Sequence, residues 1–367
     1  MRDAASYACF DDLHSPMPMS LSLSTDGNVT LQERVRPPAV PYIPLTDPRI
    51  GSVVAERYRI IEKVAVGGMG IVYRAERLGL LRPVAIKFLR SHVVHDAASR
   101  TRFEAEARAA SRLSHPNCVA VIDAGLDGDA PFIVMELVVG RTLRQVIDAG
   151  PIAIPRALEL ARQILTGLAH AHAHGVIHRD IKPDNILIST DGVREHVHIA
   201  DFGLAKCNDT LGISHDVLIG TPNYMSPEQT LGLRADARSD IYAVGVVLYE
   251  LLAHQKPFDA PTLFETLRMH REAPVPAFHD IAPDRAIPSA VEGVVRRALA
   301  KHPGKRPASA AEFLDALDIA TIFAREETDD IGVDEMLHAA GKPRWARTLG
   351  IAAALSSLVF ALGYFTA

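Results

Sequence analysis

A short polar stretch, residues 178–185 (HRDIKPDN), carries the side chains of this sequence that are best suited to chemistry. It places acidic, basic and amide side chains between two apolar segments. Asp180 can accept a proton from a hydroxyl group, Lys182 can neutralise a transferring phosphoryl group, and Asn185 can hold a metal ion. A polar surface loop could contain the same residues, so the stretch needs support from elsewhere in the chain. By itself it predicts a loop that handles phosphate.

Further motifs supply that support. The stretch HRDIKPDN resembles the catalytic loop of eukaryotic-type protein kinases. Residues 84–87 (VAIK), 201–203 (DFG) and 226–228 (SPE) resemble three more motifs of that family and stand in the family's order. The resemblance is to bacterial eukaryotic-like serine/threonine kinases and covers roughly residues 58–320. It implies an α+β fold, the bilobal protein kinase fold, with a small β-rich N-lobe and a larger helical C-lobe.

The resemblance also implies how the polar residues divide the chemistry. Asp180 is expected to orient and deprotonate the substrate hydroxyl, while Lys182 offsets charge on the moving phosphoryl group. Asn185 and Asp201 are the expected ligands of Mg²⁺, which would lie between them and the phosphates of ATP. ATP and Mg²⁺ are therefore the expected cofactors.

One lysine and one glutamate are expected to act as a pair. Lys87 would hold the α- and β-phosphates and be held in turn by Glu106, which completes the set of catalytic residues. Glu106 is preferred to Glu104 because residues 102–107 match the motif RFxxEA of bacterial members of the family. Glu104 would face another side of the helix predicted over residues 96–113. A solvated helix face is the alternative for Glu106.

Residues 58–73 follow a pattern of strand, glycine turn and strand. Glycine lets the backbone approach phosphate oxygens without a Cβ in the way. Ala65 stands where the family has its first glycine, but Gly67 and Gly70 remain, so we expect adjusted nucleotide affinity and not lost binding. An ordinary hairpin would give the same pattern, and Lys87 on the next apolar strand favours the nucleotide interpretation.

Residues 132–138 (FIVMELV) form a predicted buried strand that resembles the hinge between the lobes. Met135 would be the gatekeeper, and the backbone C=O of Glu136 and N–H of Val138 would bond the adenine edge. The apolar residues expected around the ring are equally explicable as core. The expected nucleotide-binding residues are Val64, Ala65, Val66, Gly67, Gly68, Met69, Gly70, Val72, Ala85, Lys87, Glu136, Val138 and Leu187.

Three residues are expected to support the site structurally. Asp240 opens a long apolar helix and matches the anchoring Asp of the family. Arg306 matches the arginine that pairs with the Glu of the APE motif, here Glu228. Removing one member of such a buried pair should cost about 3–5 kcal/mol.

Arg179, directly before the catalytic Asp, indicates regulation by phosphate. In the family an arginine at this place marks kinases whose activation segment is held by a phosphate, which adds charge and acceptor oxygens. Ser214 is the first phosphosite candidate and Thr210 the second, because of their distance before Thr221. The alternative is that Ser214 is simply a polar loop residue.

Three histidines, His170, His172 and His174, alternate near the end of an amphipathic helix predicted over residues 155–174. Only His170 and His174 share a face, and no Cys or acid completes a metal site. Histidines also interact favourably with the C-terminal end of a helix dipole. A structural role is therefore expected for this group and for His178.

Bulk composition excludes some classes of protein. The 367 residues are 48% hydrophobic and 23% charged, which is typical of a globular protein. The net charge of -5 shows no overall excess of basic side chains, so nucleic acid is not an expected partner. Cys9, Cys118 and Cys207 match neither a metal spacing nor a disulfide framework, which suits a reducing cytosol.

The C-terminal residues predict a membrane anchor. Residues 348–367 carry no charge, and about 20 residues can span a hydrocarbon core of about 30 Å. Lys342, Arg344 and Arg347 precede this run and would keep the kinase domain cytoplasmic, attached to the cell membrane by a single pass. A buried core helix is the alternative. Gly350 and Ala354 would allow a homodimer, although such a spacing is weak support in an Ala-rich run.

The expected domain organisation follows from these boundaries. We expect a disordered segment over residues 1–50, the N-lobe over 51–137, the C-lobe over 138–320, a juxtamembrane linker over 321–347 and a transmembrane helix over 348–367.

The sequence favours a kinase that phosphorylates protein serine or threonine. The loop sequence HRDIKPDN is typical of the family's serine/threonine kinases, and Thr221 in the substrate loop supports the same specificity. A pseudokinase scaffold is the main alternative, and Ala65 is the feature that favours it. A small-molecule kinase would share Asp180 and Asp201 but would not be expected to carry the 220–228 motif (GTPNYMSPE).

Overall fold

The structure, a computed structural model, describes residues 22–23, 29–30, 47–67, 70–89, 97–202 and 222–339. The chain divides into two compact units, Met1–Thr46 and Asp47–Ala367. In the first unit, β1 (Ser22–Leu23) pairs antiparallel with β2 (Val29–Thr30), inside a segment that was expected to lack regular structure. The second unit contains both lobes.

The N-lobe begins earlier than the sequence suggested. Asp47 accepts a hydrogen bond from the Tyr73 hydroxyl at 2.9 Å and lies 3.3 Å from Lys63 Nζ. Arg49 Nη1 lies 3.2 Å from Asp127 Oδ2. These contacts attach residues 47–50, which lie before the predicted start of the N-lobe at residue 51, to the sheet.

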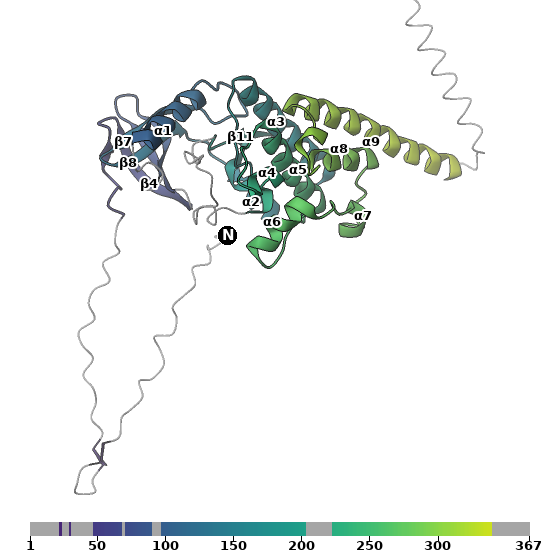
Figure 1. The fold of residues 1–367 in the computed structure, drawn as a ribbon, viewed down its shortest axis with the longest axis horizontal. Coiled ribbons are helices and arrows are strands. Elements are labelled where there is room, and N and C mark those ends of the chain that lie inside the picture. The colour runs from purple at the N-terminus through teal and green to yellow at the C-terminus, as the bar shows by residue number, and fades with distance from the viewer. Residues whose placement is uncertain are drawn as a thin grey trace, which may run out of the picture. The chain divides into compact units, whose positions relative to one another are not determined.

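A six-stranded antiparallel sheet with strand order β3-β4-β5-β6-β8-β7 forms the N-lobe (Figure 1). Its strands are β3 (Val53–Val54), β4 (Tyr58–Gly67), β5 (Gly70–Arg77), β6 (Arg82–Leu89), β7 (Val121–Asp127) and β8 (Ala130–Glu136). Helix α1 (Ala97–Ala110) packs against β7.

Strand β6 fixes the side of the sheet on which Lys87 lies. Val84, Ile86 and Phe88 belong to the core on one face of the sheet. Ala85 and Leu89 belong to a second core, which also contains Phe103 of α1. Because side chains alternate along a strand, Lys87 points to the same face as Ala85 and Leu89. The β6 sequence therefore directs the lysine towards the face of the sheet on which α1 packs.

The C-lobe is mostly helical, with a small antiparallel sheet of order β11-β10-β9. Its helices are α2 (Leu143–Asp148), α3 (Ile154–Ala173), α4 (Pro227–Thr230), α5 (Ala237–Ala253), α6 (Leu263–Glu272), α7 (Phe278–Ile281), α8 (Ser289–Ala298) and α9 (Ala310–Ala339). Its strands are β9 (Arg141–Thr142), β10 (Ile186–Asp191) and β11 (Arg194–Ile199), and its 3-10 turns are Pro183–Asn185, Pro222–Tyr224 and Pro303–Lys305.

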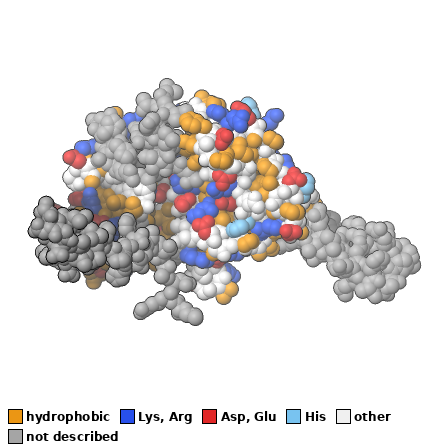
Figure 2. All heavy atoms as spheres, turned by 90° about the horizontal axis from the view of Figure 1, so that it is seen from below, with side chains coloured by type: hydrophobic (Ala, Val, Ile, Leu, Met, Phe, Trp, Pro, Cys, Tyr) orange, Lys and Arg blue, Asp and Glu red, His pale blue; other side chains and the backbone are white. Residues whose placement is uncertain are grey.

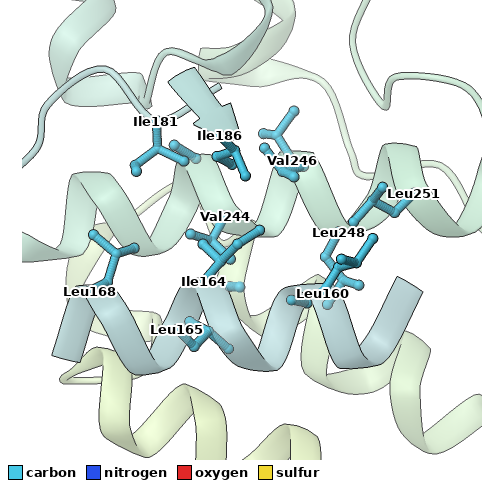
Figure 3. Close-up of a cluster of buried hydrophobic side chains, with 14 of the residues drawn as sticks. Leu160, Ile164, Leu165, Leu168, Ile181, Ile186, Val244, Val246, Leu248 and Leu251 are labelled. Atoms are coloured by element: carbon cyan, nitrogen blue, oxygen red, sulfur yellow. The ribbon is translucent and has the colours of Figure 1, made fainter. Parts of the chain in front are cut away.

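Helices α3 and α5 form the centre of this lobe, and α5 is buried along its length. Figure 3 shows Ile164 and Leu168 of α3 facing Val244 and its neighbours on α5. Ile181, from the predicted catalytic loop, enters the same cluster and is 1% exposed. Burying such a side chain contributes about 1.5–3 kcal/mol. The loop that carries Asp180 is thus attached to the core by its own apolar residue.

Helix α9 crosses the predicted boundary at residue 320. Phe313, Leu317 and Ala320 are buried in the C-lobe core, and the helix continues to Ala339 in Figure 1. The predicted linker over residues 321–347 therefore begins as helix. Across the described ranges we find no helix that is both long and apolar enough to cross a membrane. The predicted transmembrane residues 348–367 lie outside those ranges.

Candidate active site

The loop between α3 and β10 brings the predicted acid, base and amide together. Lys182 Nζ lies 2.9 Å from Asp180 Oδ2. Asn185 Nδ2 donates to the same oxygen at 3.0 Å and to the Asp180 carbonyl at 2.8 Å. The 3-10 turn Pro183–Asn185 turns the chain back towards Asp180 and makes these bonds possible. Because Nδ2 makes both bonds, Oδ1 is the remaining acceptor of the Asn185 amide.

Asp240 anchors this loop from α5. Its carboxylate accepts hydrogen bonds from the backbone N–H groups of His178 at 2.8 Å and Arg179 at 2.7 Å. His172 Nε2 lies 2.8 Å from the same carboxylate, which is 1% exposed. A buried carboxylate needs several such partners, and here they include the loop backbone. The contact of His172 with Asp240 was not predicted, because the alternation of histidines gave no hint of a partner on another helix.

Asp201 lies opposite the loop and contacts Lys87, with 2.8 Å between Oδ2 and Nζ. Burial by itself would raise the pKa of the Asp201 carboxyl, but the charge and hydrogen bond of Lys87 outweigh it and lower the pKa below its ordinary value. Asp201 is therefore ionised at neutral pH. Its φ of +64° is unusual for a non-glycine residue. Phe202 is buried beside it, with its ring centroid 5.0 Å from that of His178.

The expected pair of Lys87 and Glu106 is replaced by two other pairs in this structure. Lys87 contacts Asp201, while Glu106 Oε1 lies 3.4 Å from Arg179 Nη1. The expected pairing of Lys87 with Glu106 is therefore corrected for this structure. The physical reason is that α1 places Glu106 beside Arg179 of the catalytic loop, whereas β6 places Lys87 beside Asp201. Glu104, the residue that was not chosen, is exposed and pairs with Arg108 at 3.2 Å.

Apolar residues that were expected to lie on either side of the adenine ring pack together in one cluster, which contains residues of both lobes. Val72, Val138 and Leu187 pack against the cluster that contains Ala85 and Met135. Ala85 and Met135 are paired across β6 and β8. The N–H of Glu136 donates to the Ala120 carbonyl at 2.9 Å, so this N–H already has a partner within the protein.

The glycine-rich strand lies apart from this cluster. Val64 and Val66 are 56% and 67% exposed on β4, and Ala65 pairs with Val72 on β5. A Cβ on Gly70 would lie 2.0 Å from the Phe88 carbonyl oxygen, so glycine is needed there for strand packing. That is a different reason from the predicted approach to phosphate. A Cβ on Gly67 would have no neighbour nearer than 3.9 Å, so its surroundings are open.

The predicted pair of Glu228 and Arg306 is present and buried. Both guanidinium Nη atoms donate to the Glu228 carboxylate at 2.8 Å, and Ser239 adds a hydrogen bond at 2.6 Å. Burial opposes ionisation of Glu228, but the bonds from Arg306 and Ser239 outweigh burial and lower its pKa to about 2. This pair fixes the start of α4 to the C-lobe.

A second buried network lies beside the loop and was missed by the sequence analysis. The Tyr224 hydroxyl donates to Glu250 at 2.5 Å, and Arg144 Nη2 donates to the same carboxylate at 3.0 and 3.2 Å. It connects α2, α5 and the segment before α4. No local pattern predicts it, since the three residues are far apart in sequence.

Several predicted residues lie outside the described ranges: Gly68, Met69, Gly203, Thr210, Ser214 and Thr221.

In the part of the chain that is described, no three His, Cys, Asp or Glu residues are placed to hold a metal ion. The rings of His170 and His174 lie 4.3 Å apart between centroids and are tilted by 38°. On the face drawn in Figure 2, basic and acidic side chains are intermixed.

Comparison with known proteins agrees with this geometry. The profile of the family described as "Protein kinase domain" matches residues 58–316. The serine/threonine-protein kinase pkn3 of Myxococcus xanthus is 41% identical over 288 residues, which are 75% of this chain and 52% of the relative. PrkC of Bacillus subtilis is 40% identical over 283 residues, 77% of this chain and 43% of the relative. The chain thus spans about half the length of these relatives.

The solved structures include the same fold. The kinase domain of Mycobacterium tuberculosis PknI superposes with a TM-score of 0.60 at 27% identity, covering 74% of this chain and 98% of that domain. The two lobes, the loop that carries Asp180 and the matched profile have the same explanation: the chain belongs to the protein kinase family, among the bacterial eukaryotic-like serine/threonine kinases.

Proposed function

We propose that this chain transfers the γ-phosphoryl group of ATP to serine or threonine hydroxyls of proteins. One observation carries the proposal: the Asp180 carboxylate is held by Lys182 and Asn185 in a loop that is anchored by Asp240. A carboxylate in this setting can orient a hydroxyl and accept its proton. The names of the relatives, serine/threonine-protein kinases, support the same substrate class.

The residues around Asp180 divide the work of transfer. Lys182 Nζ, 2.9 Å from Asp180, offers positive charge where the phosphoryl group passes. Lys87 would hold the α- and β-phosphates once it leaves Asp201 for the phosphates and Glu106. The apolar cluster around Ala85 and Leu187 would receive the adenine ring.

The metal would be held by oxygen donors. Asn185 through Oδ1 and Asp201 through its carboxylate form a donor set that fits a hard divalent cation. Mg²⁺, when bound, would supply positive charge that offsets the negative charge of the phosphates. Because Asn185 is oriented by its two bonds to Asp180, the metal ligand and the proposed base are positioned together.

A transfer assay tests the proposal directly. The full chain is incubated with γ-labelled ATP, Mg²⁺ and a generic basic protein, and phosphoamino acids are identified in the product. Asp180→Asn should lower kcat by about 10²–10⁴-fold, the usual contribution of a general base. Lys87→Met should also impair transfer. Wild-type turnover no faster than that of Asp180→Asn would support the pseudokinase alternative.

We propose in addition that residues 348–367 anchor the chain in the cell membrane with the kinase domain on the cytoplasmic side. The support is the charge-free run of sequence and the three basic residues that precede it. Membrane fractionation of the full chain and of a chain ending at Lys342 tests this. The full chain should sediment with membranes and the shorter one should not; two soluble proteins would refute the anchor.

A further inference from the structure

One side chain from outside the catalytic loop reaches the backbone beside Asp180. Gln229, on the short helix α4, donates from Nε2 to the carbonyl oxygen of Arg179 at 2.8 Å. Its Oε1 accepts hydrogen bonds from the backbone N–H and the hydroxyl of Ser226, both at 3.1 Å. A single amide therefore connects the start of α4 to the catalytic loop.

The partners of this amide require the chemistry of glutamine. The Ser226 N–H can only donate, and the Arg179 carbonyl can only accept. The bridging side chain must therefore accept at one end and donate at the other. An ionised glutamate has the same shape but cannot donate, and leucine can do neither.

The bond from Gln229 holds a specific peptide plane. The Arg179 carbonyl belongs to the peptide that joins Arg179 to Asp180, and at the other end of this peptide the Asp180 N–H donates to His178 Nδ1 at 3.2 Å. Arg179 has φ of +67°, which L residues rarely adopt. Its N–H is held by Asp240 at 2.7 Å and its C=O by Gln229, so both sides of an unfavourable conformation are fixed from outside the loop.

Helix α4 is a firm support for this contact. Glu228, the neighbour of Gln229, is bound by both Nη atoms of Arg306 and by Ser239. Arg306 is 2% exposed. The position of Gln229 therefore depends on how α4 is held on the C-lobe by the contacts of Glu228.

We propose that Gln229 is a positioning residue for phosphoryl transfer. It fixes the peptide plane between Arg179 and Asp180, so the orientation of the Asp180 carboxylate depends on the contact that α4 makes through Gln229. The inference rests on the proposed kinase function and adds a residue that touches neither ATP nor the substrate hydroxyl.

Three variants of the full chain test it: Gln229→Glu, Gln229→Leu and, as a matched control, Ser226→Ala. Gln229→Glu and Gln229→Leu should lower kcat by about 10–100-fold, the scale of a small misplacement of a catalytic group. Their KM for ATP should stay within about threefold, because the nucleotide site is not touched. Ser226→Ala keeps the bond to Arg179 and should retain kcat within about threefold.

The pH dependence of Gln229→Glu separates positioning from simple stability. A protonated glutamate can donate to the Arg179 carbonyl, whereas the ionised form faces it with an oxygen. The ratio of its kcat to that of the wild type should therefore rise as the pH falls from about 8 to about 5.5. The ratio for Gln229→Leu should stay constant. All rates are measured well below the melting midpoint of each variant, so lost stability does not imitate the effect.

The outcomes are distinct. If the wild type is active, Asp180→Asn is inactive and both Gln229 variants retain kcat, the kinase function stands and the role of Gln229 is refuted. A loss in Ser226→Ala as large as that in Gln229→Leu would assign the effect to helix capping and overturn the proposal, as would a pH-independent ratio for Gln229→Glu. An inactive wild type would remove the proposed function itself.

Discussion

Arg179 of the catalytic loop and Glu106 of helix α1 form an ion pair, with 3.4 Å between Nη1 and Oε1. Lys87, the expected partner of Glu106, is bonded to Asp201 at 2.8 Å. The two pairs must exchange partners before Lys87 can be held by Glu106 in the arrangement expected for catalysis. A negative group that attracts Arg179 would release Glu106 and favour the exchange.

Removing the Arg179 side chain should therefore raise the basal activity of the unphosphorylated chain. In Arg179→Ala the backbone bonds to Asp240 and Gln229 remain, while the competition for Glu106 is lost. A partly exposed pair contributes about 0.2–1 kcal/mol, so we expect up to about a fivefold higher initial rate after phosphatase treatment. Glu106→Gln breaks the same pair but removes the partner of Lys87, and its activity should fall. A lower basal rate in Arg179→Ala would contradict the competition.

Phosphorylation between Asp201 and Glu228 should activate the chain, with Ser214 as the main site and Thr210 as the second. A phosphate brings about −1.5 to −2 charges at pH 7 and can bind Arg179 more strongly than a single carboxylate does. Mass spectrometry of the active chain should find phosphate between residues 204 and 219. Ser214→Ala should lower activity, and Arg179→Ala should not respond to phosphate.

The Asp180→Asn chain is the control for the origin of the phosphate. If the Asp180→Asn chain carries no phosphate in this segment, the wild type phosphorylates itself. If it carries as much phosphate as the wild type, another kinase supplies the phosphate. An active wild type with no phosphate in this range would refute the switch.

Replacing Arg306 by leucine should destabilise the C-lobe by about 3–5 kcal/mol, because it leaves the buried Glu228 carboxylate without its partner. Chemical denaturation of the full chain measures this change. The double variant Glu228→Gln with Arg306→Leu should recover part of the loss, because no buried charge is then unpaired. If the losses of unfolding free energy in the two single variants add up to the loss in the double variant, Glu228 and Arg306 are not energetically coupled and the prediction is wrong.

The same pair predicts a pH dependence of stability. The pKa of Glu228 is lowered to about 2 in the folded protein from an ordinary 4.5. A lowered folded pKa gives stability that is present above the unfolded pKa and is lost as the pH falls from about 4.5 to about 2. The difference in unfolding free energy between the wild type and Glu228→Gln should therefore shrink over this range. A constant difference would show that Glu228 is not the titrating group.

The sequence by itself determined what lies close along the chain. Asp180, Lys182 and Asn185 meet because a 3-10 turn spans the few residues between them. The alternation along β6 decided the face on which Lys87 lies, and the apolar spacing of α3 decided which side of that helix is buried. The order of the motifs predicted the two lobes, with the N-lobe from residue 51, and the second compact unit begins at Asp47.

Only the tertiary structure decided which distant groups pair. Glu106 of α1 lies 3.4 Å from Arg179 of the catalytic loop, a pairing that the sequence did not predict. The contacts of Gln229 with Arg179 and of His172 with Asp240 join residues from separate elements. Periodicity shows which face of an element is buried, but it does not say which buried partner a polar side chain meets. That choice depends on how whole helices pack, and packing is a property of the assembled core.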